Sequence, residues 1–220
     1  MLIPPIINFP FKFNNESLIW ITENKELLYE MFDRDFPESG GFWFNNPDTP
    51  ESFNFQSTPP AKQITNFLKK LGLTKTYIHF AIFKIVPERI GTNIETLHID
   101  APQFNVMPGR FNVLIDGDND SKMHWWNHGT SSNTVSLEII PVGKRWKVPG
   151  KNSREQIKVV GEPDYSSESL SVIQETGSFV RTEIIHALER TGRRRFIISA
   201  RIFHPWEEIH EKATLGLTNE

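Results

Sequence analysis

The sequence predicts a mainly β protein, built as a double-sheet jelly roll with a helical buttress on its N-terminal side. Two observations carry this prediction. From about residue 75 onward, apolar residues recur with a period of two in short segments, and polar turns separate most of these segments. Before residue 75, two segments carry the helical period instead. Many short strands that follow two helices fit two packed sheets buttressed by those helices.

The N-terminal elements are expected in the following order. Residues 1–20 read as extended because they hold several prolines and an alternating pair of phenylalanines. Residues 23–32 read as a short helix, and residues 36–60 as a loop that is rich in proline, asparagine and serine. A second helix is predicted over residues 60–71, where Gly72 ends it.

The β-rich part carries nine predicted strands, which are separated mostly by turns of the Pro-Gly, Asp-Gly and Thr-Gly type. They are 75–86, 93–99, 110–115, 122–126, 133–140, 156–160, 178–182, 184–190 and 194–203. The polar segment 146–177 is interpreted as a lid or an insertion, with a solvated excursion as the alternative. We expect one domain over residues 1–220, with the jelly roll at about 75–204 and the helices and loops at 1–74.

Composition excludes several classes of site and partner. The 220 residues include no cysteine, so disulfides, thiolate metal sites and cysteine nucleophiles are excluded. A formal net charge of −3 argues against a general nucleic-acid binder, because such proteins are usually basic. No apolar run is long enough to span a bilayer, and the first residues lack a basic region followed by an unbroken apolar stretch. We expect a cytoplasmic protein with no membrane partner, and the sequence leaves the oligomeric state open.

The first candidate site residues are His98 and Asp100, which lie two apart at the end of a predicted strand. Side chains alternate along a strand, so both would lie on one face. A second histidine from a distant strand would complete the two-histidine, one-carboxylate set that binds non-haem iron. His186 is the best candidate for it. The alternatives are a half-buried strand with a surface aspartate at Asp100, and a core or edge histidine at His186.

A basic residue follows His186 at a useful interval. Arg195 comes nine residues later, after a Thr-Gly turn, and a short hairpin would place it on the next strand. Ser199 lies four residues further on and shares its face. A buried arginine beside a hydroxyl suits a carboxylate, because the planar guanidinium donates paired hydrogen bonds. The alternative for residues 193–195 is a solvated basic turn.

These motifs resemble the Fe(II)/2-oxoglutarate-dependent oxygenases of the double-stranded β-helix (cupin-like) superfamily, over roughly residues 75–204. The spacing from His186 to Arg195 resembles the prolyl hydroxylase branch. The run that begins Arg110-Phe111-Asn112, soon followed by two tryptophans, resembles aspartyl/asparaginyl hydroxylase-like members. Some of those hydroxylases lack the carboxylate ligand, whereas this chain keeps Asp100.

The resemblance implies a role for each matched residue. His98, Asp100 and His186 would bind Fe(II). Arg195, helped by Ser199, would pair with the 5-carboxylate of 2-oxoglutarate. The cosubstrate or the product side of the pocket would be contacted by Arg110 and Asn112. Arg201 shares the facing of Arg195, but six residues along a strand span about 20 Å, so both cannot hold one carboxylate.

The activity implied is hydroxylation of a small-molecule or peptidyl substrate by molecular oxygen, with 2-oxoglutarate converted to succinate. Two other functions stay open: a non-catalytic cupin-like binding or structural protein, and a cupin-type metal-dependent isomerase or lyase that needs no Arg195. Other motifs are weaker. Residues 116–127 lack the glycine and glutamate of an EF-hand, and His124 and His128 lack the glutamate of a zinc protease. His204 and His210 are expected at the surface.

Overall fold

The computed structural model describes the chain in segments that together carry both helical and β-rich parts. The described residues are 3–35, 41–44, 55–83, 98–99, 108–117, 122–126, 136–141, 155–160, 168–173, 177–184, 186–188 and 194–218. The helices are α1 (Asn15–Asp35), α2 (Pro59–Lys70) and α3 (Trp206–Thr218), with a short 3-10 helix η1 (Phe55–Ser57). No helix in these segments is long and apolar enough to cross a membrane.

Within the described segments, twelve strands form two six-stranded sheets in which every strand pair is antiparallel. The first sheet has the order β1 (Ile6–Asn8), β10 (Gly177–Arg181), β5 (Gly109–Gly117), β12 (Arg195–Ile202), β3 (Thr76–Phe83) and β2 (Gly41–Phe44). The second sheet has the order β7 (Ser136–Pro141), β8 (Glu155–Val160), β4 (His98–Ile99), β11 (His186–Leu188), β6 (Lys122–Trp126) and β9 (Glu168–Ile173).

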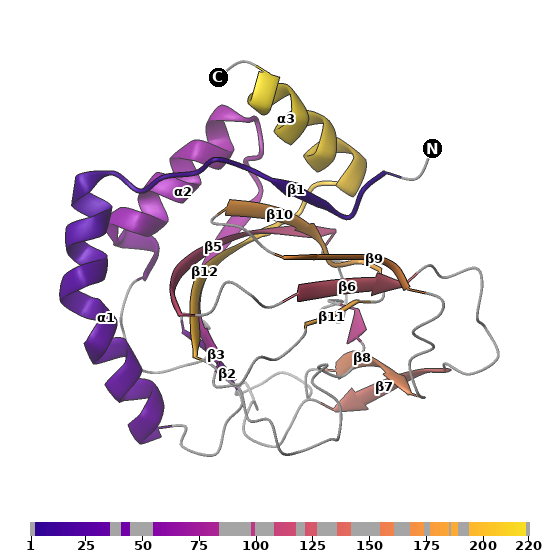
Figure 1. The fold of residues 1–220 in the computed structure, drawn as a ribbon, viewed down its shortest axis with the longest axis horizontal. Helices are drawn as coiled ribbons and strands as arrows, with labels where there is room; N and C mark the ends of the chain where they lie inside the picture. The colour runs from indigo at the N-terminus through magenta and orange to yellow at the C-terminus, as the bar shows by residue number, and fades with distance from the viewer. Residues whose placement is uncertain are drawn as a thin grey trace.

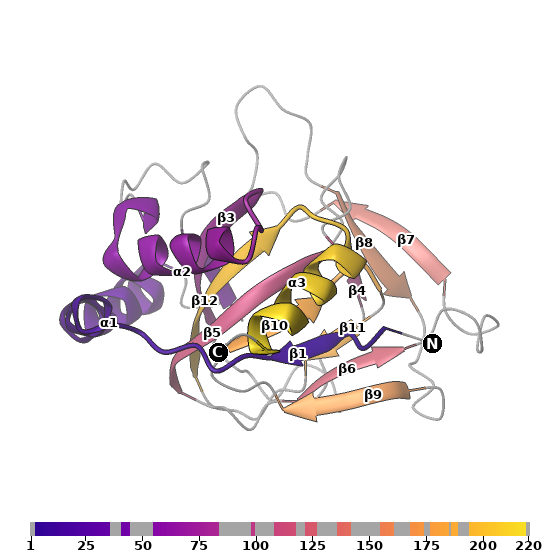
Figure 2. The same ribbon diagram turned by 90° about the horizontal axis from the view of Figure 1, so that it is seen from above.

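The helices cover only one face of the first sheet, and the second sheet lies on the other side of it (Figures 1 and 2). The covered face, here called the outer face, carries the main apolar core. Phe80, Phe111, Phe179 and Phe196 contribute to it from four different strands, and helix residues such as Leu28 pack against them. The face turned toward the second sheet is called the inner face.

Several helix and strand boundaries differ from the sequence prediction. α1 begins at Asn15, well inside the segment expected to be extended, because the Asn14 side chain accepts a hydrogen bond from the Ser17 backbone N–H at 2.9 Å and so caps the helix. Strand β2 lies inside the predicted loop. The polar segment 146–177 contributes β8 and β9 to the second sheet, so these parts are neither lid nor excursion.

The C-terminal helix α3 was not delimited from the sequence, which predicted only that His204 is strand-like, that His210 is helical, and that both lie at the surface. α3 buries Trp206, Ile209 and Ala213 against the first sheet. His204 is buried just before it, and its Nε2 accepts hydrogen bonds from the backbone N–H groups of two residues that precede β3. His204 therefore ties α3 to the start of β3, and its expected surface position is wrong.

Candidate functional site

The strand β12 alternates between the two faces of the first sheet, and its polar residues all lie on the inner one. Phe196, Ile198, Ala200 and Ile202 belong to the apolar core of the outer face. Arg195, Ser199 and Arg201 are on the opposite face because side chains alternate along a strand. Arg195 and Ser199 are buried, with 3% and 0% of their surfaces exposed. The inner face therefore holds charge and hydroxyl groups that are largely shielded from water.

Residues from the neighbouring strands extend this polar face sideways. Ser199 lies directly between His79 on β3 and Asn112 on β5. Asn112 is in turn opposite Ser178 on β10, and all four residues are buried. Directly opposite residues share one face of a sheet, so they form a continuous polar row across four strands. The row explains why Asn112 and Ser199, two residues singled out from the sequence, lie side by side.

A second row lies two residues along. Here Arg201 is directly between Tyr77 on β3 and Arg110 on β5, and Arg110 is opposite Val180 on β10. Arg110 is 7% exposed, and its Nη1 lies 3.5 Å from the hydroxyl oxygen of Ser199, at the outer limit of a hydrogen bond. The hydroxyl that the sequence assigns to Arg195 thus contacts a different arginine.

Asn112 has an oxygen whose hydrogen-bonding capacity is unused. Its Oδ1 is buried and has no hydrogen-bond partner among the described residues. Most buried polar side-chain atoms in folded proteins have a partner, and leaving one without costs free energy. Such an atom on a polar inner face is suited to accept a hydrogen bond from a ligand.

Arg195 sits at the other end of β12, where the backbone conformation is special. It pairs with Gly117 of β5, which adopts a φ of +95°. A Cβ atom at Gly117 would lie 2.0 Å from the backbone oxygen of Arg194, so only glycine permits this approach. The preceding Arg194 is exposed and pairs with Asp33 of α1 at 2.6 Å. Of these two arginines, only Arg195 belongs to the inner face.

The second sheet brings two of the predicted metal ligands together. The backbone register pairs His98 of β4 directly with His186 of β11. His186 is 3% exposed, and its Nδ1 lies 2.8 Å from the carbonyl oxygen of Ile184, to which it can only donate. That hydrogen bond puts the ring proton on Nδ1, so Nε2 is the ring nitrogen that carries the lone pair in the neutral imidazole. Asp100, the third predicted ligand, lies outside the described residues.

Trp125 links the histidine strands to the first sheet. It is the cross-strand partner of His186 on β6 and packs against Val180, the residue opposite Arg110. Its indole N–H also donates to the carbonyl oxygen of Arg181 at 2.9 Å. The face that carries Trp125 and His186 therefore looks toward the first sheet, on the side of the Arg110–Arg201 row.

The remaining predicted positions contribute less. The described residues hold no cluster of three histidine, aspartate or glutamate residues, and His128 lies outside them. His124 is buried on β6, and His210 is partly exposed on α3.

Asp116 accepts hydrogen bonds from Tyr29 and Lys25. Burial, followed by the charge of Asp116, raises the pKa of the Tyr29 hydroxyl well above its usual value.

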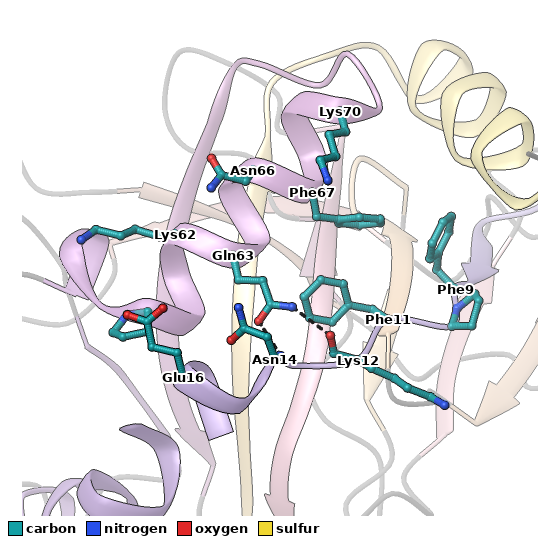
Figure 3. Close-up of a pocket in the computed structure, with 12 residues that line it drawn as sticks. Phe9, Phe11, Lys12, Asn14, Glu16, Lys62, Gln63, Asn66, Phe67 and Lys70 are labelled. Atoms are coloured by element: carbon teal, nitrogen blue, oxygen red, sulfur yellow. Dashed lines mark hydrogen bonds between the residues drawn. The ribbon is translucent and has the colours of Figure 1, made fainter. Parts of the chain in front are cut away.

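An open pocket of about 710 Å³ lies elsewhere, on the helical side of the molecule (Figure 3). It runs between α2 and the segment that joins β1 to α1. Gln63 bridges its walls, donating to the Lys12 carbonyl at 2.9 Å and accepting from the Asn14 N–H at 3.0 Å. None of the residues assigned from the sequence line it, so it is separate from the inner face.

Sequence reasoning missed Tyr77 and His79 on the inner face. The signal was present: both alternate with Ile78, Phe80 and Ile82 in an otherwise apolar segment, and all three of these belong to the outer core. The segment was read as strand, but nothing in the sequence says that this strand pairs with β12. Only the pairing of β3 with β12 places His79 beside Ser199.

Comparisons with known proteins give similarities of structure alone. No family model matches the chain, and no curated protein matches its sequence. A prolyl-4-hydroxylase from Pseudomonas putida has a TM-score of 0.42 at 10% identity, over 90% of this chain and 91% of that chain. AviO1 from Streptomyces viridochromogenes Tue57 has a TM-score of 0.46 at 11% identity, over 91% and 90%.

A third solved structure, EvdO2 from Micromonospora carbonacea var. aurantiaca, has a TM-score of 0.39 at 10% identity, over 90% of this chain and 94% of that chain. The sequence motifs predict a likeness to a prolyl hydroxylase. Because these TM-scores stay below one half, they carry no functional argument, and the function proposed for this chain depends on its own residues.

Proposed function

We propose that this protein is a non-haem Fe(II)/2-oxoglutarate-dependent dioxygenase that hydroxylates a small-molecule or peptidyl substrate. The observation that carries the proposal is the direct pairing of His98 with His186, on a sheet that faces buried arginines. Cross-strand partners share one face of a sheet, so the register puts positions 98 and 186 on the same face of the second sheet. In sequence, Asp100 is two residues beyond His98 and completes the ligand set.

The strand order supports a jelly-roll reading of the β-rich part. Between β3 and β12 the chain passes back and forth between the sheets: β3, β5, β10 and β12 belong to the first, and β4, β6, β9 and β11 to the second. Two antiparallel sheets between which the chain alternates in this way are typical of a double-stranded β-helix. A metal and a cosubstrate would then lie between the sheets.

His186 fits the role of an iron ligand. Histidine ligands commonly donate their second ring N–H to a carbonyl, which fixes the tautomer and orients the ring. The contact from Nδ1 to the Ile184 carbonyl meets that description, and Nε2 is the ring nitrogen that would bind the metal. When bound, the iron supplies oxygen activation, through which substrate, 2-oxoglutarate and O₂ become hydroxylated substrate, succinate and CO₂.

The chain's own residues bind and shield the reactants. Arg195 pairs with the 5-carboxylate of 2-oxoglutarate through its guanidinium, with Ser199 on the same face, and Asn112 and Arg110 contact the cosubstrate or the product side. Arg195 and Ser199 are almost completely buried, so water competes little for the carboxylate. Charge-assisted hydrogen bonds are stronger in such surroundings than in water.

The test is an anaerobic Fe(II) titration of the full chain by calorimetry, followed by detection of succinate in air. We expect one iron per chain, with affinity lowered about a hundredfold or more in His98→Ala and His186→Ala. His210→Ala, on the partly exposed side of α3, is the matched control and should bind iron like the wild type.

Two results would replace the proposal. If iron binds but 2-oxoglutarate is never consumed, even without substrate, a binding or structural protein is the better description. If a metal-dependent activity persists in Arg195→Ala, a cupin-type isomerase or lyase replaces the oxygenase, because those reactions need no cosubstrate carboxylate.

A further inference from the structure

The open pocket on the helical side of the molecule has an aromatic wall. Phe9 and Phe11, from the segment that joins β1 to α1, and Phe67 of α2 all line it. The ring centroid of Phe67 lies 4.9 Å from that of Phe9 and 5.1 Å from that of Phe11, and both pairs are T-shaped. Phe67 is only partly buried. The three rings therefore form one array that a further ring could join.

The charged residues that line the same pocket are mostly basic. They are Lys12, Lys62, Lys70 and Glu16, and all four are exposed. Three positive charges less one negative charge leave a formal charge of +2, whereas the whole chain carries −3. A hollow lined by one sign of charge raises the local concentration of ions of the opposite sign. The pocket is therefore suited to an anion, although the protein as a whole is slightly acidic.

The excess positive charge lies beside the rings. Figure 3 shows Lys12 and Lys70 on the side of the pocket that the phenylalanines occupy, and Lys62 and Glu16 toward the other side. Lys70 follows Phe67 by three residues along α2, so the two side chains lie on one face of the helix. A ligand that touches the rings would thus also meet two ammonium groups, while the glutamate offsets the third lysine.

The two walls of the pocket are held in place before any ligand binds. Gln63 of α2 donates from Nε2 to the Lys12 carbonyl at 2.9 Å. Its Oε1 accepts from the Asn14 N–H at 3.0 Å and from the Ser17 hydroxyl at 2.8 Å. A preformed site costs a ligand less ordering, and a volume of about 710 Å³ is typical of small-molecule sites. These properties favour a small molecule as the occupant.

We propose that this pocket binds an aromatic carboxylic acid. The aromatic ring of the ligand packs on the wall formed by Phe9, Phe11 and Phe67, because ring edges and faces carry opposite partial charges and attract one another. Its carboxylate pairs with the ammonium groups of Lys12 and Lys70. The site is distinct from the inner face of the first sheet and does not depend on the proposed oxygenase function.

The test measures binding of 2-naphthoate to the full chain by equilibrium dialysis. We expect the wild type to bind it, and Lys12→Gln and Lys70→Gln each to weaken binding about threefold. Phe67→Leu keeps an apolar side chain but removes the ring, and should also weaken binding about threefold. Lys69→Gln is the matched control, because Lys69 is the exposed neighbour of Lys70 and does not line the pocket; it should bind like the wild type.

Uncharged 2-naphthamide should bind about tenfold more weakly than 2-naphthoate, since it keeps the rings and loses both ion pairs. The inference is overturned if 2-naphthoate does not bind, if 2-naphthamide binds equally well, or if Lys69→Gln weakens binding as much as Lys70→Gln. If 2-naphthyl phosphate binds and 2-naphthoate does not, the carboxylate class is wrong.

Saturating 2-oxoglutarate should leave 2-naphthoate bound, because the two sites are separate. Displacement would put the probe in the cosubstrate site and overturn the inference, while the oxygenase proposal would be unaffected. Conversely, if 2-naphthoate binds through Lys70 and 2-oxoglutarate never binds, the oxygenase proposal fails and the aromatic acid site remains.

Discussion

The two faces of β12 contrast sharply although their residues alternate along one strand. The outer face presents Phe196, Ile198, Ala200 and Ile202 to the helices, and all four are essentially inaccessible to solvent. The inner face presents Arg195, Ile197, Ser199 and Arg201 to the second sheet. Both faces are covered, so burial alone does not account for the difference.

The comparison separates residues that stabilise the fold from residues that are available to a ligand. Apolar side chains gain free energy when they leave water, whereas buried polar groups cost free energy unless they are paired. A sheet that served only stability would carry apolar residues on both faces. The neighbours Phe111 and Asn112 on β5 show the same contrast, since they point to opposite faces and both are buried.

The largest expected effect lies on the outer face. Phe111→Ala removes a ring that packs against Phe11, Phe67 and Phe179 at centroid distances of 5.6, 5.2 and 4.6 Å. The lost transfer energy and the cavity left behind should lower the free energy of unfolding by about 3–5 kcal/mol. Urea unfolding followed by circular dichroism measures it. Leu215→Ala, at an exposed position of α3, is the control and should change little.

Gly117 is expected to be the most sensitive position where the strands meet beside Arg195. In Gly117→Ala the new methyl group would collide with the Arg194 carbonyl oxygen, in a backbone conformation that alanine disfavours. Stability should fall by about 2–3 kcal/mol, with weaker 2-oxoglutarate binding because Arg195 must shift. In Gly216→Ala the new methyl group would meet side chains and no backbone, the flexible end of Leu71 at 2.6 Å and the Phe9 ring at 3.3 Å, so the loss should be milder. Equal losses in the two variants would contradict the role assigned to Gly117.

On the inner face, replacing a polar residue by an apolar one should raise the free energy of unfolding instead of lowering it. Asn112→Leu replaces a buried amide, whose oxygen has no hydrogen-bond partner in the described part of the chain, by an apolar side chain of similar size. We expect the free energy of unfolding to rise by about 1 kcal/mol while binding of 2-oxoglutarate weakens, because Asn112 is proposed to contact the cosubstrate. The same urea unfolding measurement that is used for Phe111→Ala gives the comparison directly. A stability loss as large as that of Phe111→Ala would mean that Asn112 belongs to the structural core.

The smallest effect concerns a surface carboxylate away from both faces. Hydrogen bonds from Lys212, at 2.5 Å, and then from His204 lower the pKa of Glu208 below its usual value. A lowered pKa means that the unfolded chain binds the proton more readily, so this stabilisation is present at neutral pH. It is lost as the pH falls through the usual glutamate range and below. Melting temperatures across acid pH should show a shallower decline in Glu208→Gln than in the control Glu211→Gln.

Many of the strands could be predicted from the sequence, because an apolar face and a polar face give a local alternation with a period of two. Residues 122–126 form β6 as predicted, and β12 lies within the predicted 194–203. The helix expected at 60–71 is α2, displaced by one residue at each end. The start of α1 and the whole of β9 were missed. A capping asparagine and a polar edge strand carry too little apolar period to be recognised without tertiary contacts.

The candidate site was readable only in part, for a related reason. The alternation of side chains along β12 correctly placed Arg195 and Ser199 on one face, because the face of a strand residue depends only on its position in that strand. The neighbours of these residues are not local: His79 and Asn112 reach Ser199 from strands about 120 and 87 residues away. The assigned ligand roles of His98, Asp100 and His186 stay predictions. Positions 98 and 186 are paired by the register of β4 and β11, and the spacing of residues along the sequence cannot predict that pairing.

The partner of β1 bears on how the chain folds during synthesis. Asn8 accepts a hydrogen bond from the hydroxyl of Ser178, 170 residues further along. At about 5–20 residues per second, a ribosome takes roughly 10–35 seconds to cover that interval. Throughout it, the apolar Ile6 and Ile7 have no strand beside them. Protection of the nascent chain by a chaperone should therefore matter more for this protein than for one whose first strand closes a local hairpin.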